Sequence, residues 1–130
     1  MIKTAEKKDL PAILNLIEIG SQNGQVLMRP VDEISQFLNS FFVYVEDEKV
    51  VGCAALDIYN KKLAEVRSLA VLPGFQNKGI GGKLIQKCIQ KARGAGIYEI
   101  LAVTDKQKLF ERVGFKAKLA NNKQPLLIKL

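Results

Sequence analysis

Residues 63–82 read LAEVRSLAVLPGFQNKGIGG, and this stretch decides the fold. Its first part is apolar and predicts a long strand, Leu63–Val71, and Pro73-Gly74 predicts a loop after it. A helix over residues 80–93 follows, because its apolar side chains recur at helical spacing on one face: Leu84, Ile85, Cys88, Ile89 and Ala92. The centre of the sequence therefore predicts a strand, a glycine-rich loop and a helix, in that order.

The segments on both sides predict short elements that complete one α/β domain. The predicted strands cover residues 2–5, 42–45, 50–56, 99–103, 115–119 and 126–130, and the predicted helices cover residues 9–20, 32–39 and 106–113. A turn at residues 47–49 makes a hairpin, and the strand after the central helix should run parallel to the strand before it. The last two strands should pair across Asn121-Asn122. The element order is βααβββαβαββ, with a mixed central sheet in a single domain over residues 1–130.

The chain of 130 residues contains no histidine, and this absence excludes several kinds of site. A Ser-His-Asp triad, a Cys-His nucleophile and a histidine-ligated metal all require it. Catalysis then depends on carboxylates, lysine, tyrosine, thiols or backbone groups. Cys53 and Cys88 each lie in an apolar run, which is typical of small buried side chains rather than of a disulfide framework or a metal knuckle. We therefore expect no bound metal.

Basic residues exceed acidic ones, since 20 Lys and Arg against 13 Asp and Glu give a formal charge of +7. The basic residues are spread along the chain without a basic-aromatic stripe or arm. This argues against a nucleic-acid binder and fits a polyanionic small ligand. No apolar segment is long enough for a leader or a membrane span. We expect a cytoplasmic protein without membrane association. The sequence leaves open whether it forms a homodimer.

A glycine-rich loop stands between the central strand and the central helix, and it offers backbone groups to an anion. Its residues are Gln76, Asn77, Lys78, Gly79, Ile80, Gly81 and Gly82. Glycines let N–H groups approach phosphate oxygens, and the positive end of the following helix adds to the attraction. The loop is neither a Walker A motif nor a dinucleotide fingerprint, whose third glycine would replace Leu84. Alone, it fits an anion site and a helix that begins after loose glycines equally well.

Two motifs in the sequence are similar to those of a known family. The strand end Leu69-Ala70-Val71-Leu72-Pro73, followed by Gln76-x-x-Gly79-x-Gly81, resembles the acetyl-CoA signature of the GNAT superfamily of N-acetyltransferases. Residues 109–115, LFERVGF, match the second motif of that family. The predicted element order is also that of the GNAT fold. The resemblance covers essentially the whole chain and implies an N-acetyltransferase that uses acetyl-CoA as its co-substrate.

Three shorter stretches look like the acetyltransferase domain of the N-acetylglutamate synthases. They are residues 26–29 (VLMR), residues 52–56 (GCAAL) and Glu65-x-x-Ser68-Leu69-Ala70-Val71. That family acetylates the α-amino group of glutamate, the first step of arginine biosynthesis. The narrower resemblance implies glutamate as the acceptor. Its α-carboxylate would be bound by Arg29, with Leu27 and Ser68 at flanking positions of the pocket.

The same resemblance implies the catalytic groups. Glu65 matches the general base that takes the ammonium proton, and the backbone N–H of Val71 matches the donor to the oxyanion. Phe110 stands where many members carry a tyrosine that protonates the departing thiolate, so we assign no general acid. The residues expected at the cofactor are Leu69, Ala70, Val71, Gln76, Asn77, Lys78, Gly79, Ile80, Gly81, Gly82 and Phe110. Without the resemblance, Glu65 also fits a solvated carboxylate on a strand.

Glutamate carries two carboxylates, so its pocket should be cationic. Arg29 can bind a carboxylate through two parallel hydrogen bonds, which lysine cannot do. Arg67 and Arg112 are further cations near the motifs, but a bulge between Glu65 and Arg67 would place these two on different faces of the strand. Two alternatives stay open. One is an acetyltransferase for another amine (a protein N-terminus, a lysine or a small metabolite), and the other is a CoA-binding regulatory module that has lost catalysis.

Overall fold

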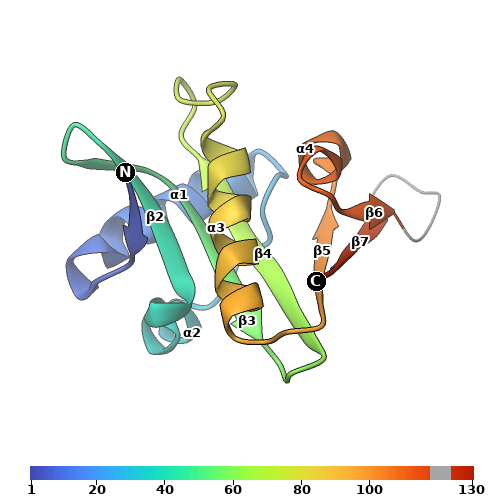
Figure 1. The fold of residues 1–130 in the computed structure, drawn as a ribbon. Coiled ribbons are helices and arrows are strands. Elements are labelled where there is room, and N and C mark those ends of the chain that lie inside the picture. The colour runs from blue at the N-terminus through green and yellow to red at the C-terminus, as the bar shows by residue number, and fades with distance from the viewer. Residues whose placement is uncertain (118–123) are drawn as a thin grey trace.

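The computed structural model describes residues 1–117 and 124–130, which form a seven-stranded sheet with helices on both faces (Figure 1). The strands are β1 (Ile2–Thr4), β2 (Phe41–Glu46), β3 (Lys49–Ile58), β4 (Leu63–Val71), β5 (Glu99–Thr104), β6 (Lys116–Ala117) and β7 (Gln124–Lys129). The helices are α1 (Leu10–Gln22), α2 (Val31–Gln36), α3 (Ile80–Gly94) and α4 (Gln107–Arg112), with 3-10 turns at Lys7–Asp9 and Leu38–Ser40. None of the helices in these two ranges combines the length and the apolar character needed to cross a membrane.

The sheet has the order β1-β2-β3-β4-β5-β7-β6, in which β4 and β5 are parallel and the other neighbours are antiparallel. One face packs against the apolar side of α3, where Leu84, Ile85 and Cys88 are fully buried. The opposite face packs against α1 through Ile13 and Ile17. Figure 1 accordingly shows α3 in front of the sheet and α1 behind it. The predicted apolar face of the central helix is therefore the core of one layer.

Strand β4 loses one partner midway along its length. Residues 63–65 pair with residues 99–101 of β5, and the described pairing of these two strands ends there. On the β3 side, Ala55 pairs with Arg67 and Cys53 pairs with Ala70, so one residue of β3 faces two residues of β4. This is a β-bulge, and Ser68 within it has a φ of +57°. The second half of β4 therefore follows β3 while β5 diverges from it.

The bulge determines which side chains of β4 share a face. It lies after Arg67, so Glu65 and Arg67 point to the same side, and the sequence alone could not place them. The extra residue also shifts the alternation. Leu69 enters the core under α3, whereas Ala70 enters the core under α1. The thiol of Cys53 donates to the carbonyl oxygen of Ser68 at 3.4 Å, which satisfies that buried backbone group inside the bulge.

The structure confirms the predicted element order and fold, with different bounds at some ends. Helix α1 continues past Gly20 to Gln22, and a 3-10 turn precedes it. Asp9 does not cap α1 with its side chain, because its carboxylate accepts bonds from Lys3 Nζ and the Glu6 N–H, both at 2.8 Å. The helix predicted over residues 32–39 is divided into α2 and the second 3-10 turn. The strand predicted over residues 115–119 is described only as β6, and the predicted Asn121-Asn122 turn lies outside the described residues.

Both cysteines are buried, as the sequence predicts, and burial raises the pKa of the Cys53 and Cys88 thiols to about 12. A raised pKa leaves almost no thiolate near neutral pH, and thiolate is the reactive form. We expect the folded protein not to react with Ellman's reagent at about pH 8, and both thiols to react after unfolding in guanidinium. The absorbance of released thionitrobenzoate measures this. Rapid reaction of either thiol in the folded protein would contradict the burial.

Candidate active site

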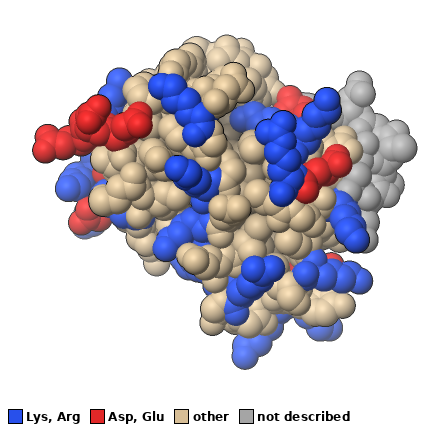
Figure 2. All heavy atoms as spheres, turned by 45° about the horizontal axis from the view of Figure 1, so that its top comes forward, with Lys and Arg blue, Asp and Glu red and all other residues tan. Residues whose placement is uncertain are grey.

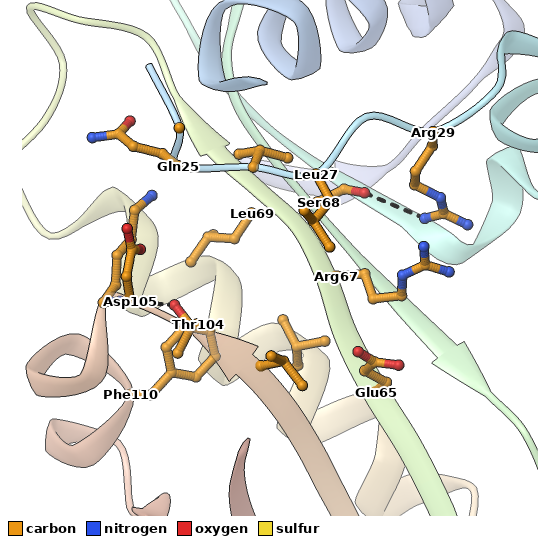
Figure 3. Close-up of a pocket in the computed structure, with 15 residues that line it drawn as sticks. Gln25, Leu27, Arg29, Glu65, Arg67, Ser68, Leu69, Thr104, Asp105 and Phe110 are labelled. Atoms are coloured by element: carbon orange, nitrogen blue, oxygen red, sulfur yellow. Dashed lines mark hydrogen bonds between the residues drawn. The ribbon is translucent and has the colours of Figure 1, made fainter. Parts of the chain in front are cut away.

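The divergence of β4 and β5 leaves a small cavity of about 120 Å³ between the two strands. Its lining comes from β4, from the end of β5 and the start of α4, and from the loop at residues 24–29. Figure 3 shows Arg29, Arg67 and Ser68 on one side of the cavity and Thr104 and Phe110 on the other. The cavity is therefore a consequence of the sheet opening rather than of a surface loop folding over it.

A second cavity, of about 520 Å³, lies at the glycine-rich loop before α3. Gly79 is the N-cap of α3 with a φ of +82°, and a Cβ built there would meet no heavy atom within 4 Å. Gly81 and Gly82 also line this cavity, together with Arg112. Figure 2 shows that Lys and Arg side chains outnumber Asp and Glu side chains on the face where this loop comes forward. Free backbone at a helix N-terminus, in a positive surrounding, suits an anionic ligand.

The two cavities meet, because Gln25 and Lys106 line both of them. Lys106 is the N-cap of α4, and its backbone N–H donates to Thr104 Oγ1 at 2.9 Å. Burial lowers the pKa of Lys106, and the neighbouring Asp105 opposes that shift. A ligand that extends from the larger cavity into the smaller one would pass this lysine.

The backbone of Val71 is directed away from β3. The N–H of Leu72 donates to the carbonyl of Val51 at 2.9 Å, within the ladder between β4 and β3. Neighbouring residues of an antiparallel strand turn their backbone groups to opposite sides, so Val71 turns its N–H and carbonyl toward the side from which β5 has diverged. Accordingly, the Val71 carbonyl accepts a bond from Gln76 Nε2 at 3.0 Å. The described strand pairing gives the Val71 N–H no partner.

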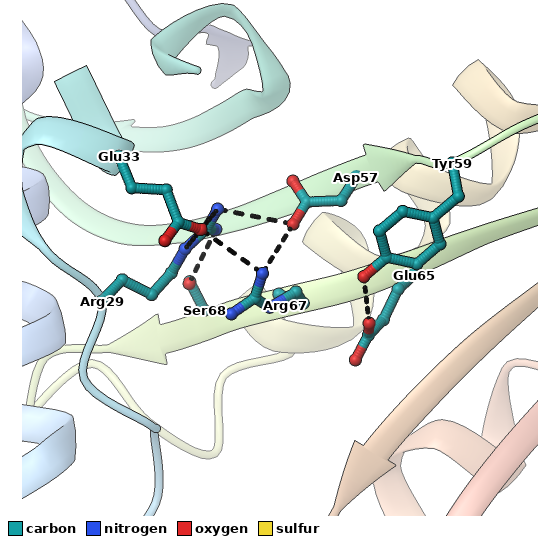
Figure 4. Close-up of polar contacts among 7 residues, drawn as sticks. All are labelled: Arg29, Glu33, Asp57, Tyr59, Glu65, Arg67 and Ser68. Carbon is teal, nitrogen blue, oxygen red and sulfur yellow. Dashed lines mark hydrogen bonds and ion pairs between the residues drawn. The ribbon is translucent and has the colours of Figure 1, made fainter. Parts of the chain in front are cut away.

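Arg29 is buried, with its side chain 2% exposed, and two carboxylates compensate its charge (Figure 4). Its Nε and Nη2 donate to Glu33 Oε1 at 3.0 and 2.7 Å, and its Nη2 lies 3.4 Å from Asp57 Oδ2. Its Nη1 donates to Ser68 Oγ at 3.3 Å. Arg67 joins the same network, because its Nη1 donates to Asp57 Oδ2 at 3.1 Å.

The expected cationic pocket is thus a network of two arginines and two carboxylates. The Arg29 hydrogen bonds lower the pKa of Glu33, so that carboxylate is ionised at neutral pH. Glu33 occupies the Nε–Nη2 edge of Arg29, so this edge is not open to a second carboxylate. The Nη1 group, beside Ser68, is the part of Arg29 nearest to the hydroxyl that lines the cavity.

Glu65 accepts a hydrogen bond from the hydroxyl of Tyr59 (Figure 4). Desolvation of the hydroxyl, together with the Glu65 and Asp57 carboxylates, raises the pKa of Tyr59 to about 12. Tyr59 therefore stays protonated at neutral pH and remains a donor to Glu65 Oε1. This bond fixes the orientation of the carboxylate and leaves its second oxygen for another partner.

Most of the predicted site residues surround the two cavities. Those that line the small cavity are Leu27, Arg29, Glu65, Ser68, Leu69 and Phe110. Those that line the large cavity are Val71, Gln76, Asn77, Gly79, Ile80, Gly81 and Gly82. Ala70 and Lys78 line neither. Ala70 is part of the core under α1, and Lys78 Nζ lies 5.3 Å from the centre of the Phe75 ring.

Sequence reasoning did not single out several residues of the site. Glu33 had a detectable signal, since its i, i+4 spacing to Arg29 is the spacing of a helical ion pair. Asp57 and Tyr59 reach the site through the pairing of β3 with β4, which puts Asp57 opposite Glu65. Lys106 gains its position only when β5 diverges from β4. These three placements depend on sheet register, which a single sequence does not reveal.

Comparisons with known proteins place the chain among acetyltransferases. A model of the acetyltransferase (GNAT) family matches residues 13–115 of the chain. An uncharacterized N-acetyltransferase of Chlorobaculum tepidum is 37% identical over 115 residues, which are 88% of this chain and 74% of that protein. The amino-acid acetyltransferase of Pasteurella multocida is 29% identical over 117 residues, which are 88% of this chain but only 27% of that protein.

Solved structures with the same fold include one with a bound product. The N-acetylglutamate synthase from Neisseria gonorrhoeae, complexed with coenzyme A and N-acetyl-glutamate, has a TM-score of 0.90 and 27% identity. It is matched over 100% of this chain and 35% of its own. Rv2747 from Mycobacterium tuberculosis, in complex with CoA, has a TM-score of 0.93 over 100% of this chain and 99% of its own. Its 21% identity shows the fold alone.

Proposed function

Because the chain belongs to the acetyltransferase (GNAT) family, we propose that this N-acetyltransferase uses acetyl-CoA to acetylate the α-amino group of glutamate. The proposal depends on the small cavity, which is lined by the buried cation of Arg29, by Ser68 and by the carboxylate of Glu65. An α-amino acid brings a carboxylate for the first two and an ammonium group for the third. The similarity to amino-acid acetyltransferases supports the same class of acceptor.

The size and the donors of the cavity support a small acceptor with two carboxylates. Its volume of about 120 Å³ is below the roughly 300–1,000 Å³ of pockets for drug-sized ligands. We assign the α-carboxylate to Arg29 Nη1 and the Ser68 hydroxyl, and the second carboxylate to the half-exposed Arg67. Each acceptor carboxylate then competes with Glu33 or Asp57 for a guanidinium group. The cytoplasmic location stays a prediction from the sequence, and the question of a homodimer stays open.

The acceptor is tested by an acetyl-CoA turnover screen across the amino acids, which detects the released CoA thiol. We expect turnover with glutamate, and we expect Arg29→Lys to raise the KM for glutamate by about tenfold or more, because lysine cannot reproduce the geometry of the guanidinium donors. Arg93→Lys, on the exposed side of α3, is the matched control and should leave the KM unchanged. Acetyl-CoA affinity should stay the same in both variants. Turnover confined to another amine would overturn glutamate as the acceptor.

The acid–base step of the proposal is assigned to Glu65. An α-ammonium group must lose a proton before its nitrogen can attack the thioester carbonyl, and a carboxylate can take that proton directly or through water. Tyr59 holds Glu65 Oε1, so the second oxygen is assigned as the proton acceptor. The N–H of Val71 is assigned as the donor to the carbonyl oxygen as negative charge develops on it.

We predict that Glu65→Gln lowers kcat by about 10²–10⁴-fold, because glutamine keeps the shape but is not a base. The amide oxygen can still accept the bond from Tyr59, so acetyl-CoA affinity should hardly change. Steady-state kinetics across pH measures the effect. Activity of the variant should recover as pH rises and the acceptor amine loses its proton unaided. Glu18→Gln, exposed on α1, is the control. A variant with near wild-type kcat at neutral pH would remove Glu65 from the chemistry.

The larger cavity fits the diphosphate of acetyl-CoA. Gly79 and Gly81 both border it, a Cβ built at Gly79 would meet no heavy atom within 4 Å, and α3 directs its N-terminal N–H groups toward the cavity. The second half of β4 pairs with β3 but has no described pairing with β5, so this side of the strand, with the backbone of Val71, is the hydrogen-bonding edge to which the pantetheine arm is assigned. We therefore assign the diphosphate to the residues of the glycine-rich loop, with Arg112 as a nearby cation.

Two glycines in the connection between β4 and α3 offer a matched test of this assignment. Gly79 and Gly74 have φ values of +82° and +89°, so alanine is similarly strained at both, but only Gly79 lines the large cavity. We expect Gly79→Ala to weaken acetyl-CoA binding by about tenfold or more, since its methyl group enters the ligand space, and Gly74→Ala to leave binding near the wild-type value. Calorimetric titration of both folded variants measures this. Equal affinities would contradict the assignment.

A further inference from the structure

Lys106 and Gln25 are the two described residues that line both cavities. The N–H groups of Leu109 and Phe110 donate to its carbonyl at 3.1 and 3.3 Å, and its own N–H is bound by Thr104 Oγ1. The backbone of Lys106 is therefore held at both ends, and its half-buried side chain starts from a fixed point at the junction. The proposed function joins the thioester in one cavity to the amine in the other, and this junction is where they meet.

The lining of the two cavities offers few groups that can give up a proton. Neither cavity is lined by a tyrosine, a cysteine or a second lysine among the described residues. Phe110 has no hydroxyl. The cavities are also lined by Arg29, Arg67 and Arg112, but a guanidinium group stays protonated in proteins and is a poor acid. The ammonium group of Lys106 is the remaining proton donor in this lining, and burial lowers its pKa.

We propose that Lys106 is the general acid that protonates the sulfur of CoA as it leaves. The amine nitrogen forms a bond to the thioester carbonyl carbon, and the electron pair of that carbonyl moves to oxygen. When the pair returns, the carbon–sulfur bond breaks and its electrons go to sulfur. Sulfur then takes a proton from Lys106 Nζ, which gives the CoA thiol and a neutral amine. Glu65 takes one proton from the ammonium group before the attack, and the nitrogen loses a second proton to water as the amide forms. One of the two returns to Lys106 through water and the other is released to solvent, so the protons balance over one turnover.

The surroundings of Lys106 favour this role. Burial lowers its pKa from the ordinary lysine value of 10.5, which makes it a stronger acid, and Asp105 keeps part of the charge stabilised. The Cys53 thiol on β3 stays neutral, because burial raises its pKa to about 12. The other charged groups that line the two cavities are Arg29, Glu65, Arg67 and Arg112. Because its pKa is lowered, Lys106 loses its proton at a lower pH than an ordinary lysine. Activity should therefore fall as pH rises and Lys106 becomes neutral.

The kinetic test compares Lys106→Met and Lys106→Arg with Lys108→Met, an exposed lysine of α4. We expect Lys106→Met and Lys106→Arg to lower kcat by about 10²-fold or more, with little change in acetyl-CoA affinity, and Lys108→Met to behave as wild type. The alkaline fall of kcat in the wild type should disappear in Lys106→Met. A Lys106→Arg variant with wild-type kcat would overturn proton donation, because arginine keeps the charge but is a poor acid.

A binding test needs no acceptor, so it separates this proposal from the choice of glutamate. The affinity for CoA is compared with that for desulfo-CoA between about pH 7 and pH 9, by calorimetry. A cation beside the sulfur favours the thiolate, so in the wild type we expect the preference for CoA to grow by about tenfold over this range. Lys106→Arg should keep that growth and Lys106→Met should lose it. A preference in Lys106→Met that still grows with pH would overturn the placement of Lys106 at the sulfur.

Discussion

The bulge of β4 at Ser68 is the constraint on which the rest of the site depends. Before it, β4 pairs on both sides, and after it the strand follows β3 while β5 diverges. An extra residue in one strand bends that strand and increases its local twist, which is a physical reason for two parallel strands to part. The small cavity and the direction of the Val71 N–H away from β3 follow from this irregularity. Because the bulge lies after Arg67, regular alternation before it keeps Glu65 and Arg67 on a common face. Ser68 adopts a positive φ to make the bulge, a conformation that costs a non-glycine residue free energy and persists only where surrounding contacts enforce it.

The second constraint is electrostatic, and it explains why the arginines beside the small cavity form ion pairs. A guanidinium group that is 2% exposed would be very costly without partners, because it loses nearly all of its hydration. Glu33 and Asp57 provide those partners, so the side chain of Arg29 can be buried. Their presence also changes how the cavity selects a ligand. A free buried cation would attract any small anion, whereas the charge of Arg29 is already compensated by Glu33 and Asp57. An acceptor carboxylate bound as proposed would gain little from charge alone and would also have to match Ser68.

The sequence predicted the parts of this protein that local patterns control. The apolar face of α3, the hairpin of β2 and β3 and the glycine-rich loop all follow from spacing and turn chemistry within short windows. The motifs also identified Arg29, Ser68 and Glu65, which the fold brings to one cavity. What the sequence could not supply was register. The position of the bulge, the pairing of Asp57 with Glu65 and the approach of Tyr59 depend on which residues of β3 and β4 face each other. The role of Lys106 depends in the same way on where β5 leaves the sheet.

The charge of the whole chain and the charge of the acceptor cavity act on different ligands. A net charge of +7 and the basic face around the glycine-rich loop create a long-range field that attracts a polyanion. Such a field falls off within about 8–10 Å at physiological salt, so it acts at the open surface of the larger cavity. The arginines of the smaller cavity are already paired with carboxylates. Net charge therefore favours the approach of a polyanionic cofactor, whereas the proposed selection of the acceptor relies on hydrogen-bond geometry. The same field disfavours polycationic amines as acceptors, because a basic protein repels them before they reach the geometry that would select them.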